Sequence, residues 1–218
     1  MMGRLATGTC SWPFRGFLAL LLVLAWASTT KADSSSRIVR VEEDWELVVA
    51  TPDPDSDGPQ VACVISPVGD LDSVHAAFEL NNQSLPSFVP GGLQLQIWSG
   101  EMPLSQRKFP NEAVMAQPGE TVRWTQSMKL TDEGLVFEIT NGSSSTWGTF
   151  GGQGYLKAAV ATTLTDLNGY HPEVSVQNSG VSYAANRVES LVLRRVRAVT
   201  STGEVLEDTS ARTVCQSP

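Results

Sequence analysis

The chain has 218 residues, with 15 lysine and arginine residues against 23 aspartate and glutamate residues, so its formal net charge is −8 at neutral pH. This length suits a single domain with a sizeable core. A hydrophobic content of 41% with only 17% charged residues excludes a disordered chain. The acidic balance, with its basic residues dispersed, argues against nucleic-acid binding.

Residues 1–27 have the organisation of a secretory signal peptide. Arg4 and Arg15 precede an apolar run at 17–24, and Ala25-Trp26-Ala27 places small residues where signal peptidase requires them. The apolar run is too short to span a bilayer about 30 Å thick. The sequence therefore predicts export.

Cleavage is expected after Ala27, with Thr30-Lys31-Ala32 as a second possible site, and an uncleaved N-terminal anchor is the alternative. Residues 28–36 are small and polar and are expected to form a flexible leader. The mature protein is then extracellular, periplasmic or associated with the cell envelope, with no later segment able to span a membrane.

Cleavage leaves two cysteines, Cys63 and Cys215. An even pair in an exported chain predicts one disulfide, which would close a long loop and stabilise the fold by about 4–5 kcal/mol. Two unpaired thiols without a role are the alternative. The C-x-x-C spacing of redox and zinc sites is absent from the sequence.

From residue 37 onward, apolar and polar residues alternate with the period of two that is typical of half-buried antiparallel strands. Turn residues separate the alternating runs, and no window of a dozen residues has a helical apolar stripe. The strands are expected at 45–49, 61–65, 76–80, 93–98, 121–128, 135–140, 156–161, 173–176, 181–183 and 188–200.

About ten strands in a chain of this length predict an all-β fold. We expect a two-layer antiparallel β-sandwich or jelly roll over residues 37–209, without a helix longer than two turns. A C-terminal tail is expected at 210–218.

Two segments carry a resemblance to a known superfamily. Glu120–Gly152 resembles the central strands of concanavalin A-like lectin and glucanase sandwiches, and Asn178–Arg195 is similar to their closing strands. This resemblance implies a concanavalin A-like sandwich. It implies no activity, because the Glu-x-Asp-x-Glu strand of laminarinase-type members is absent and the acidic cluster at 42–46 has a different spacing.

One acidic segment has the beginning of a calcium-binding loop. Asp53, Asp55 and Asp57 precede Gly58 with the spacing of the first ligands in such a loop, but the twelfth position is Val64 instead of glutamate. A weak structural calcium site is therefore one possibility, and a solvated acidic loop is the other. The sequence predicts no other cofactor.

Motifs for nucleophilic or zinc catalysis are absent from the sequence, which has no G-x-S-x-G and no H-E-x-x-H. Its only histidines are His75, expected on the exposed side of a strand, and His171, expected in a turn. A protein without catalytic activity is therefore favoured over an enzyme.

A polar and aromatic surface is the strongest candidate for binding. Gln94, Gln96 and Trp98 share the side of a strand that faces away from its apolar residues, and an indole flanked by amides suits sugar recognition. Arg123 and Glu138 are expected to continue this surface on neighbouring strands. In the alternative interpretation, Trp98 packs under a loop or in the core.

The sequence thus favours a secreted, non-catalytic β-sandwich that binds extracellular or cell-envelope polysaccharide through one sheet face. A secreted glycoside hydrolase or lyase of the same fold is one alternative, and it would need two carboxyl groups roughly 5–9 Å apart across a groove. A purely structural or adhesive envelope protein is the other. Asn82-Gln83-Ser84 and Asn141-Gly142-Ser143 are N-glycosylation sequons.

Overall fold

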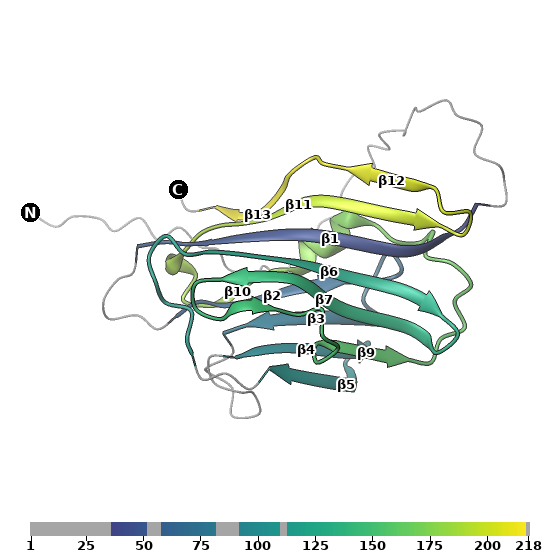
Figure 1. The fold of residues 1–218 in the computed structure, drawn as a ribbon, viewed down its shortest axis with the longest axis horizontal. Helices are drawn as coiled ribbons and strands as arrows, with labels where there is room; N and C mark the ends of the chain where they lie inside the picture. The colour runs from purple at the N-terminus through teal and green to yellow at the C-terminus, as the bar shows by residue number, and fades with distance from the viewer. Residues whose placement is uncertain (1–35, 52–57, 82–91, 110–112, 217–218) are drawn as a thin grey trace, which may run out of the picture.

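The computed structural model describes residues 36–51, 58–81, 92–109 and 113–216. Two antiparallel sheets pack face to face as a sandwich, with almost no helix between them (Figure 1). This arrangement confirms the predicted all-β, two-layer fold.

The larger sheet, called sheet A, contains eight strands among the described residues. They are β1 (Ile38–Val49), β6 (Thr121–Thr131), β7 (Gly134–Ser144), β8 (Gly148–Phe150), β9 (Lys157–Val160), β11 (Val188–Thr200), β12 (Val205–Asp208) and β13 (Arg212–Gln216). Their order is β12-β11-β1-β6-β7-β8, and β13 also pairs with β11 while β9 pairs with β7.

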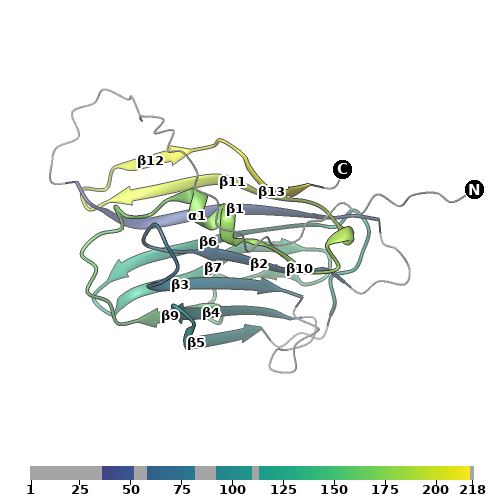
Figure 2. The ribbon, with the colours of Figure 1, turned by 180° about the vertical axis from the view of Figure 1, so that it is seen from behind.

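The smaller sheet, called sheet B, has five strands in the described part of the chain, in the order β10-β2-β3-β4-β5. They are β2 (Gln60–Ile65), β3 (Val74–Leu80), β4 (Leu93–Ser99), β5 (Met102–Phe109) and β10 (Gly180–Tyr183). Sheet A is wider, so sheet B covers only part of its inner face (Figures 1 and 2).

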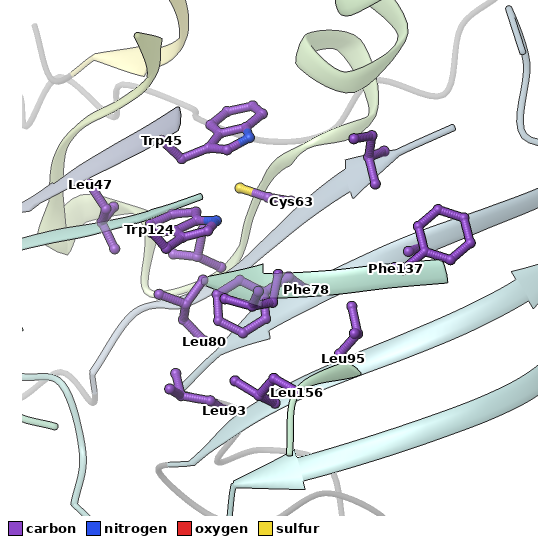
Figure 3. Packing of buried hydrophobic residues seen from close by; sticks show 14 of the residues in the cluster. Trp45, Leu47, Cys63, Phe78, Leu80, Leu93, Leu95, Trp124, Phe137 and Leu156 are labelled. Carbon is purple, nitrogen blue, oxygen red and sulfur yellow. The ribbon is translucent and has the colours of Figure 1, made fainter. Parts of the chain in front are cut away.

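The hydrophobic core lies between the sheets and is built from the predicted apolar sides of the strands (Figure 3). Trp45 of β1 and Trp124 of β6 stack with ring centroids 6.3 Å apart and planes 7° from parallel. Phe78 of β3, in sheet B, packs against Trp124 with the ring centroids 5.7 Å apart. Aromatic pairs of this kind add to the stabilisation that burial provides.

A short helix replaces one predicted strand. Residues 173–176 belong to α1 (Pro172–Asn178), because Pro172 stands in the first turn, where its fixed φ suits a helix and its missing N–H costs nothing. The helix packs on β2 and β13, beside the part of sheet A that sheet B leaves uncovered (Figure 2). With seven residues it is about two turns long, as expected. A single 3₁₀ turn, η1 (Ala185–Arg187), precedes β11.

Four strands were not predicted, namely β5, β8, β12 and β13. β5 is an exposed edge strand containing Pro103, and β13 falls within the predicted tail at 210–218 but pairs with β11. These strands are short or polar, so they lack a clear alternating pattern. None of the helices in the described part of the chain is long and apolar enough to cross a membrane.

Candidate functional site

The structure divides the predicted binding face between two opposite surfaces. Gln94, Gln96 and Trp98 lie on β4 and point to the outer face of sheet B, since the core side of that strand is formed by its apolar residues. Arg123 of β6 and Glu138 of β7 lie on the outer face of sheet A. The expectation of one continuous surface is therefore wrong.

On sheet B, the two predicted amides are buried and already paired. Gln94 Nε2 donates to Glu79 Oε2 at 2.8 Å and Gln94 Oε1 accepts from Gln106 Nε2 at 2.8 Å, while Gln96 Nε2 lies 3.4 Å from Glu79 Oε2. Gln94 is 2% exposed and Gln96 is 5% exposed. These amides hold neighbouring strands together, which leaves little of them for sugar hydroxyls.

Trp98 is half-buried on the same face. It lies opposite His75 of β3 and Pro103 of β5, and the two neighbours of Pro103 on β5, Met102 and Leu104, are exposed. Trp98 is therefore the only one of these three residues of β4 that is not buried. His75 is buried, in contrast to the prediction, because β3 has a neighbouring strand on each side. Its Nδ1 lies 3.1 Å from Ser73 O.

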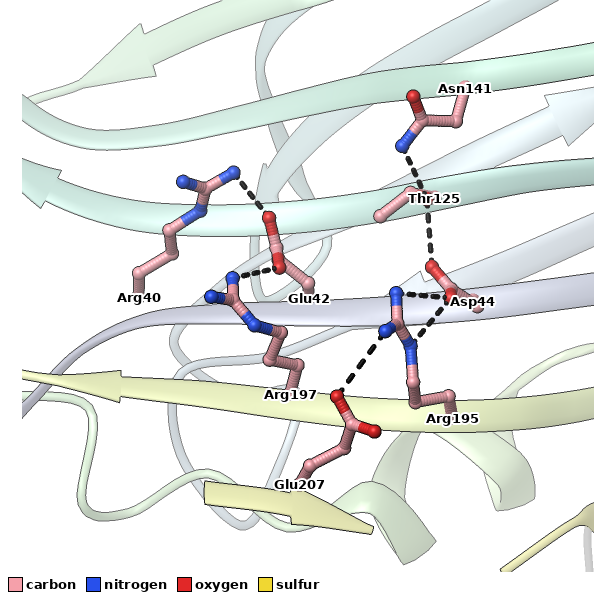
Figure 4. A network of polar contacts seen from close by, with 8 residues as sticks. All are labelled: Arg40, Glu42, Asp44, Thr125, Asn141, Arg195, Arg197 and Glu207. Atoms are coloured by element: carbon pink, nitrogen blue, oxygen red, sulfur yellow. Dashed lines mark hydrogen bonds and ion pairs between the residues drawn. The ribbon is translucent and has the colours of Figure 1, made fainter. Parts of the chain in front are cut away.

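On sheet A, oppositely charged side chains face one another across β11 and β1 (Figure 4). Arg197 Nη1 donates to Glu42 Oε2 at 2.8 Å, and Glu42 also pairs with Arg40. Arg195 Nε donates to Asp44 Oδ2 at 2.8 Å. The network extends to Glu207, Thr125 and Asn141. Because the three arginines and the three acidic residues of this network are paired, the network is close to neutral overall.

Arg123 belongs to a neighbouring group of three charged residues, together with Glu46 and Arg194. Glu46 accepts hydrogen bonds from Arg194 Nη2 at 2.6 Å and from Arg123 Nε at 2.8 Å. The hydrogen bond from Arg194 lowers the pKa of the Glu46 carboxyl, and the bond from Arg123 lowers it further. Arg123 therefore links β6 to β1, which is a structural role.

Beside this network, the outer face of sheet A is hollowed into a groove of about 410 Å³. The groove is open to solvent and lies over β1, β6, β7 and β9 and the turn between β6 and β7. It is lined by Arg40, Ser127, Lys129, Thr131, Asp132, Glu133, Val136, Glu138 and Lys157.

The strand register explains how the groove is arranged. Ser127 lies opposite Glu138, which in turn lies opposite Lys157, while Lys129 lies opposite Val136 in the adjacent row. Ser127 and Val136 are buried and form the floor, whereas both lysines are exposed. Within the described ranges, no ion pair involves Lys129, Lys157 or the Glu138 carboxylate.

These groups suit recognition of a polar ligand. Lysine ammonium groups donate to hydroxyl, carboxylate or sulfate oxygens, and the Glu138 carboxylate accepts from hydroxyls. The lining contains neither histidine nor cysteine. Of the predicted site residues, only Glu138 lies in this groove.

The two cysteines are buried without a disulfide, in contrast to the prediction. Cys63 is on β2 in sheet B and its side chain contacts Ser179, whereas Cys215 is on β13 in sheet A, opposite Leu191. Burial raises the pKa of the Cys63 thiol well above its usual range, and nearby Glu43 and Cys215 act in the same direction. A buried thiol of raised pKa is a poor nucleophile.

We therefore expect neither thiol to react with a maleimide in the native chain that lacks residues 1–27. Both should react after unfolding in urea without reductant, because unfolding exposes them and lets them ionise. Intact mass spectrometry would count the adducts. Absence of both adducts after unfolding would instead indicate the disulfide.

The remaining predicted site residues gain no support. Asp53, Asp55 and Asp57 lie outside the described residues, and no group of three or more potential metal ligands was found among the residues that the structure does describe. His171 is exposed at the start of α1, as expected for a turn residue.

The fold and groove define the class of this protein as a two-sheet antiparallel β-sandwich with a polar groove on the outside of its larger sheet. No protein-family model matches the chain, and no curated protein shows significant similarity to it. The function must therefore be argued from the groove itself.

Proposed function

We propose that the protein is an exported, non-catalytic β-sandwich that binds extracellular or cell-envelope polysaccharide in the groove on the outer face of sheet A. The observation that carries this proposal is that two exposed lysines without an ion pair in the described structure, Lys129 and Lys157, line the groove together with Glu138 and the buried Ser127. Together they present donors and acceptors for the closely spaced oxygens of a sugar chain.

Two further points support the proposal. The segment that resembles concanavalin A-like lectins, Glu120–Gly152, contains β6, β7 and β8, so the groove lies on the strands that carry the resemblance. The organisation of residues 1–27 is typical of an exported chain, which would meet polysaccharides outside the cell. An open groove of this kind predicts weak binding, in the micromolar to millimolar range of about −4 to −8 kcal/mol.

The double variant Lys129→Gln/Lys157→Gln should weaken binding at least about tenfold, because glutamine retains a donor but loses the charge-assisted hydrogen bonds. A glycan array of the mature protein, with and without calcium, would first identify a ligand. Isothermal titration calorimetry would then compare the variants, with circular dichroism as a check on folding.

Trp98→Ala provides the matched control, since it removes the largest side chain from the opposite face. It should leave the affinity unchanged. If Trp98→Ala abolishes binding while the lysine variant binds normally, the site is on sheet B and the groove proposal fails. If no glycan binds at any concentration tested, polysaccharide binding is refuted.

A further inference from the structure

A carboxylate lies inside the sandwich, on the core side of β1. Glu43 is 0% exposed and occupies the row of β1 that also holds the buried residues Val41 and Trp45. A charge at such a position is costly unless several hydrogen bonds compensate it.

Three donors converge on this carboxylate. Ser175 Oγ donates to Oε1 at 2.5 Å, Tyr170 OH donates to the same oxygen at 2.7 Å, and Trp45 Nε1 donates to Oε2 at 3.0 Å. Ser175 belongs to α1 and Tyr170 to the loop before it, so Glu43 connects this helical segment to sheet A. The contacts thus fasten α1 over the uncovered part of the sheet (Figure 2).

The other titratable groups near Glu43 come from the elements packed around it. Cys63 faces it from β2, and Cys215 and Arg212 belong to β13. Arg212 is already engaged with Asp208 at 2.6 Å and Glu173 at 2.9 Å. Its charge therefore only partly offsets that of Glu43.

Burial dominates the ionisation of this group. It raises the pKa of Glu43 from 4.5 to about 7, although the three hydrogen bonds and Arg212 act in the opposite direction. Burial and the neighbouring Glu43 also raise the pKa of Tyr170 well above its usual range, so the phenol keeps its proton throughout. Glu43 is then the group in this cluster that changes charge near neutral pH.

We propose that Glu43 is a pH-sensitive lock that holds α1 and its preceding loop on sheet A when protonated and loosens them when ionised. Deprotonation releases one proton to solvent and leaves a buried negative charge. Opening of the helical segment lets water reach this charge, which lowers its energy. This proposal is independent of polysaccharide binding.

The direction of the effect follows from proton linkage. With α1 closed, the pKa of Glu43 is about 7, and in the open, hydrated state it returns to about 4.5. The closed state therefore binds more protons between these values, so opening increases as pH rises from about 4.5 to about 7 and levels off above. Between pH 5 and pH 8, the opening equilibrium should increase on the order of 70-fold.

Hydrogen exchange measured by mass spectrometry on the mature protein would test this. Protection of peptides covering 165–180, corrected for the pH dependence of intrinsic exchange, should fall by this factor between pH 5 and pH 8. Peptides from β3 and β4 should change less. In Glu43→Gln, which has no titratable group at this position, protection of the helical segment should be independent of pH.

The matched control is His75→Gln/His171→Gln, because these are the only two histidines in the chain. This variant should retain the wild-type pH dependence. If Glu43→Gln does not fold, the histidine variant still tests the proposal. Loss of the pH-dependent protection in the histidine variant would assign the effect to histidine and overturn the proposal. Equal protection of wild type at both pH values, or greater protection at pH 8, would overturn it as well.

Discussion

Trp45→Phe should destabilise the protein by about 1–3 kcal/mol more than Trp124→Phe, although the two indoles stack against each other in the same core. Trp45 is 1% exposed and Trp124 is 2% exposed, so both replacements remove similar buried area. They differ in hydrogen bonding. Trp45 Nε1 donates to Glu43, whereas Trp124 Nε1 is buried without a hydrogen-bond partner in the described structure.

Phenylalanine at position 45 therefore leaves a buried carboxylate oxygen unsatisfied, while at position 124 it removes an unsatisfied donor. Urea unfolding of both variants at pH 8, where Glu43 is ionised, would measure the difference. The difference in stability between the two variants should be smaller at pH 5, because a neutral carboxyl group loses less free energy than a carboxylate when its hydrogen-bond donor is removed. Equal losses of stability at pH 8 would show that the Trp45–Glu43 bond contributes nothing.

Asn81→Ala should cost about 3–5 kcal/mol, the largest effect we expect from a single polar residue. The Asn81 side chain is fully buried and donates to Pro59 O at 3.0 Å and to Met115 O at 3.2 Å, while its Oδ1 accepts from Met115 N at 3.1 Å. Alanine would leave all three backbone groups without this partner. The backbone at position 81 also has a φ of 60°, in the left-handed region, which alanine adopts less readily than asparagine.

Asn141→Ala separates the two causes, because Asn141 has a similar φ of 53° but is exposed. Its side chain makes a single hydrogen bond, to Thr125 Oγ1 at 3.1 Å. Thermal or urea unfolding should show a loss of only about 1–2 kcal/mol for this control. Similar losses in the two variants would mean that backbone strain, and not the buried hydrogen bonds, explains the role of Asn81.

Alternation predicted most of the fold because a strand with one buried face must repeat every two residues. It placed Leu95 and Phe137 on the core side correctly. The same pattern misled at 173–176, where four residues are too few to distinguish a strand from a helical turn and Pro172 favoured the helix. It also places Glu43 on the core side of its strand next to Trp45, which is the sequence signal for a buried carboxylate.

The candidate site was harder to predict because alternation gives the side of a residue within its own strand, but not the sheet that the strand joins. A sandwich has two outer faces, and Trp98 and Glu138 point outward on different ones. Lys157 could not have been paired with Glu138 from the sequence, since β9 has four residues and its partner is set by tertiary packing.

The central position of β1 in sheet A has a consequence for the kinetics of folding. β1 lies between β11 and β6 (Figure 1). Its residue Glu46 contacts Arg123 and Arg194, which are 77 and 148 positions away in the sequence. No local hairpin can therefore pair β1, whereas β6 and β7 are joined by a tight turn and can pair early. Closing such long loops is entropically expensive, which places folding in the millisecond-to-second range of β-sandwiches. During synthesis, β1 is made before either of its partners and must wait for β11 before its second edge is covered.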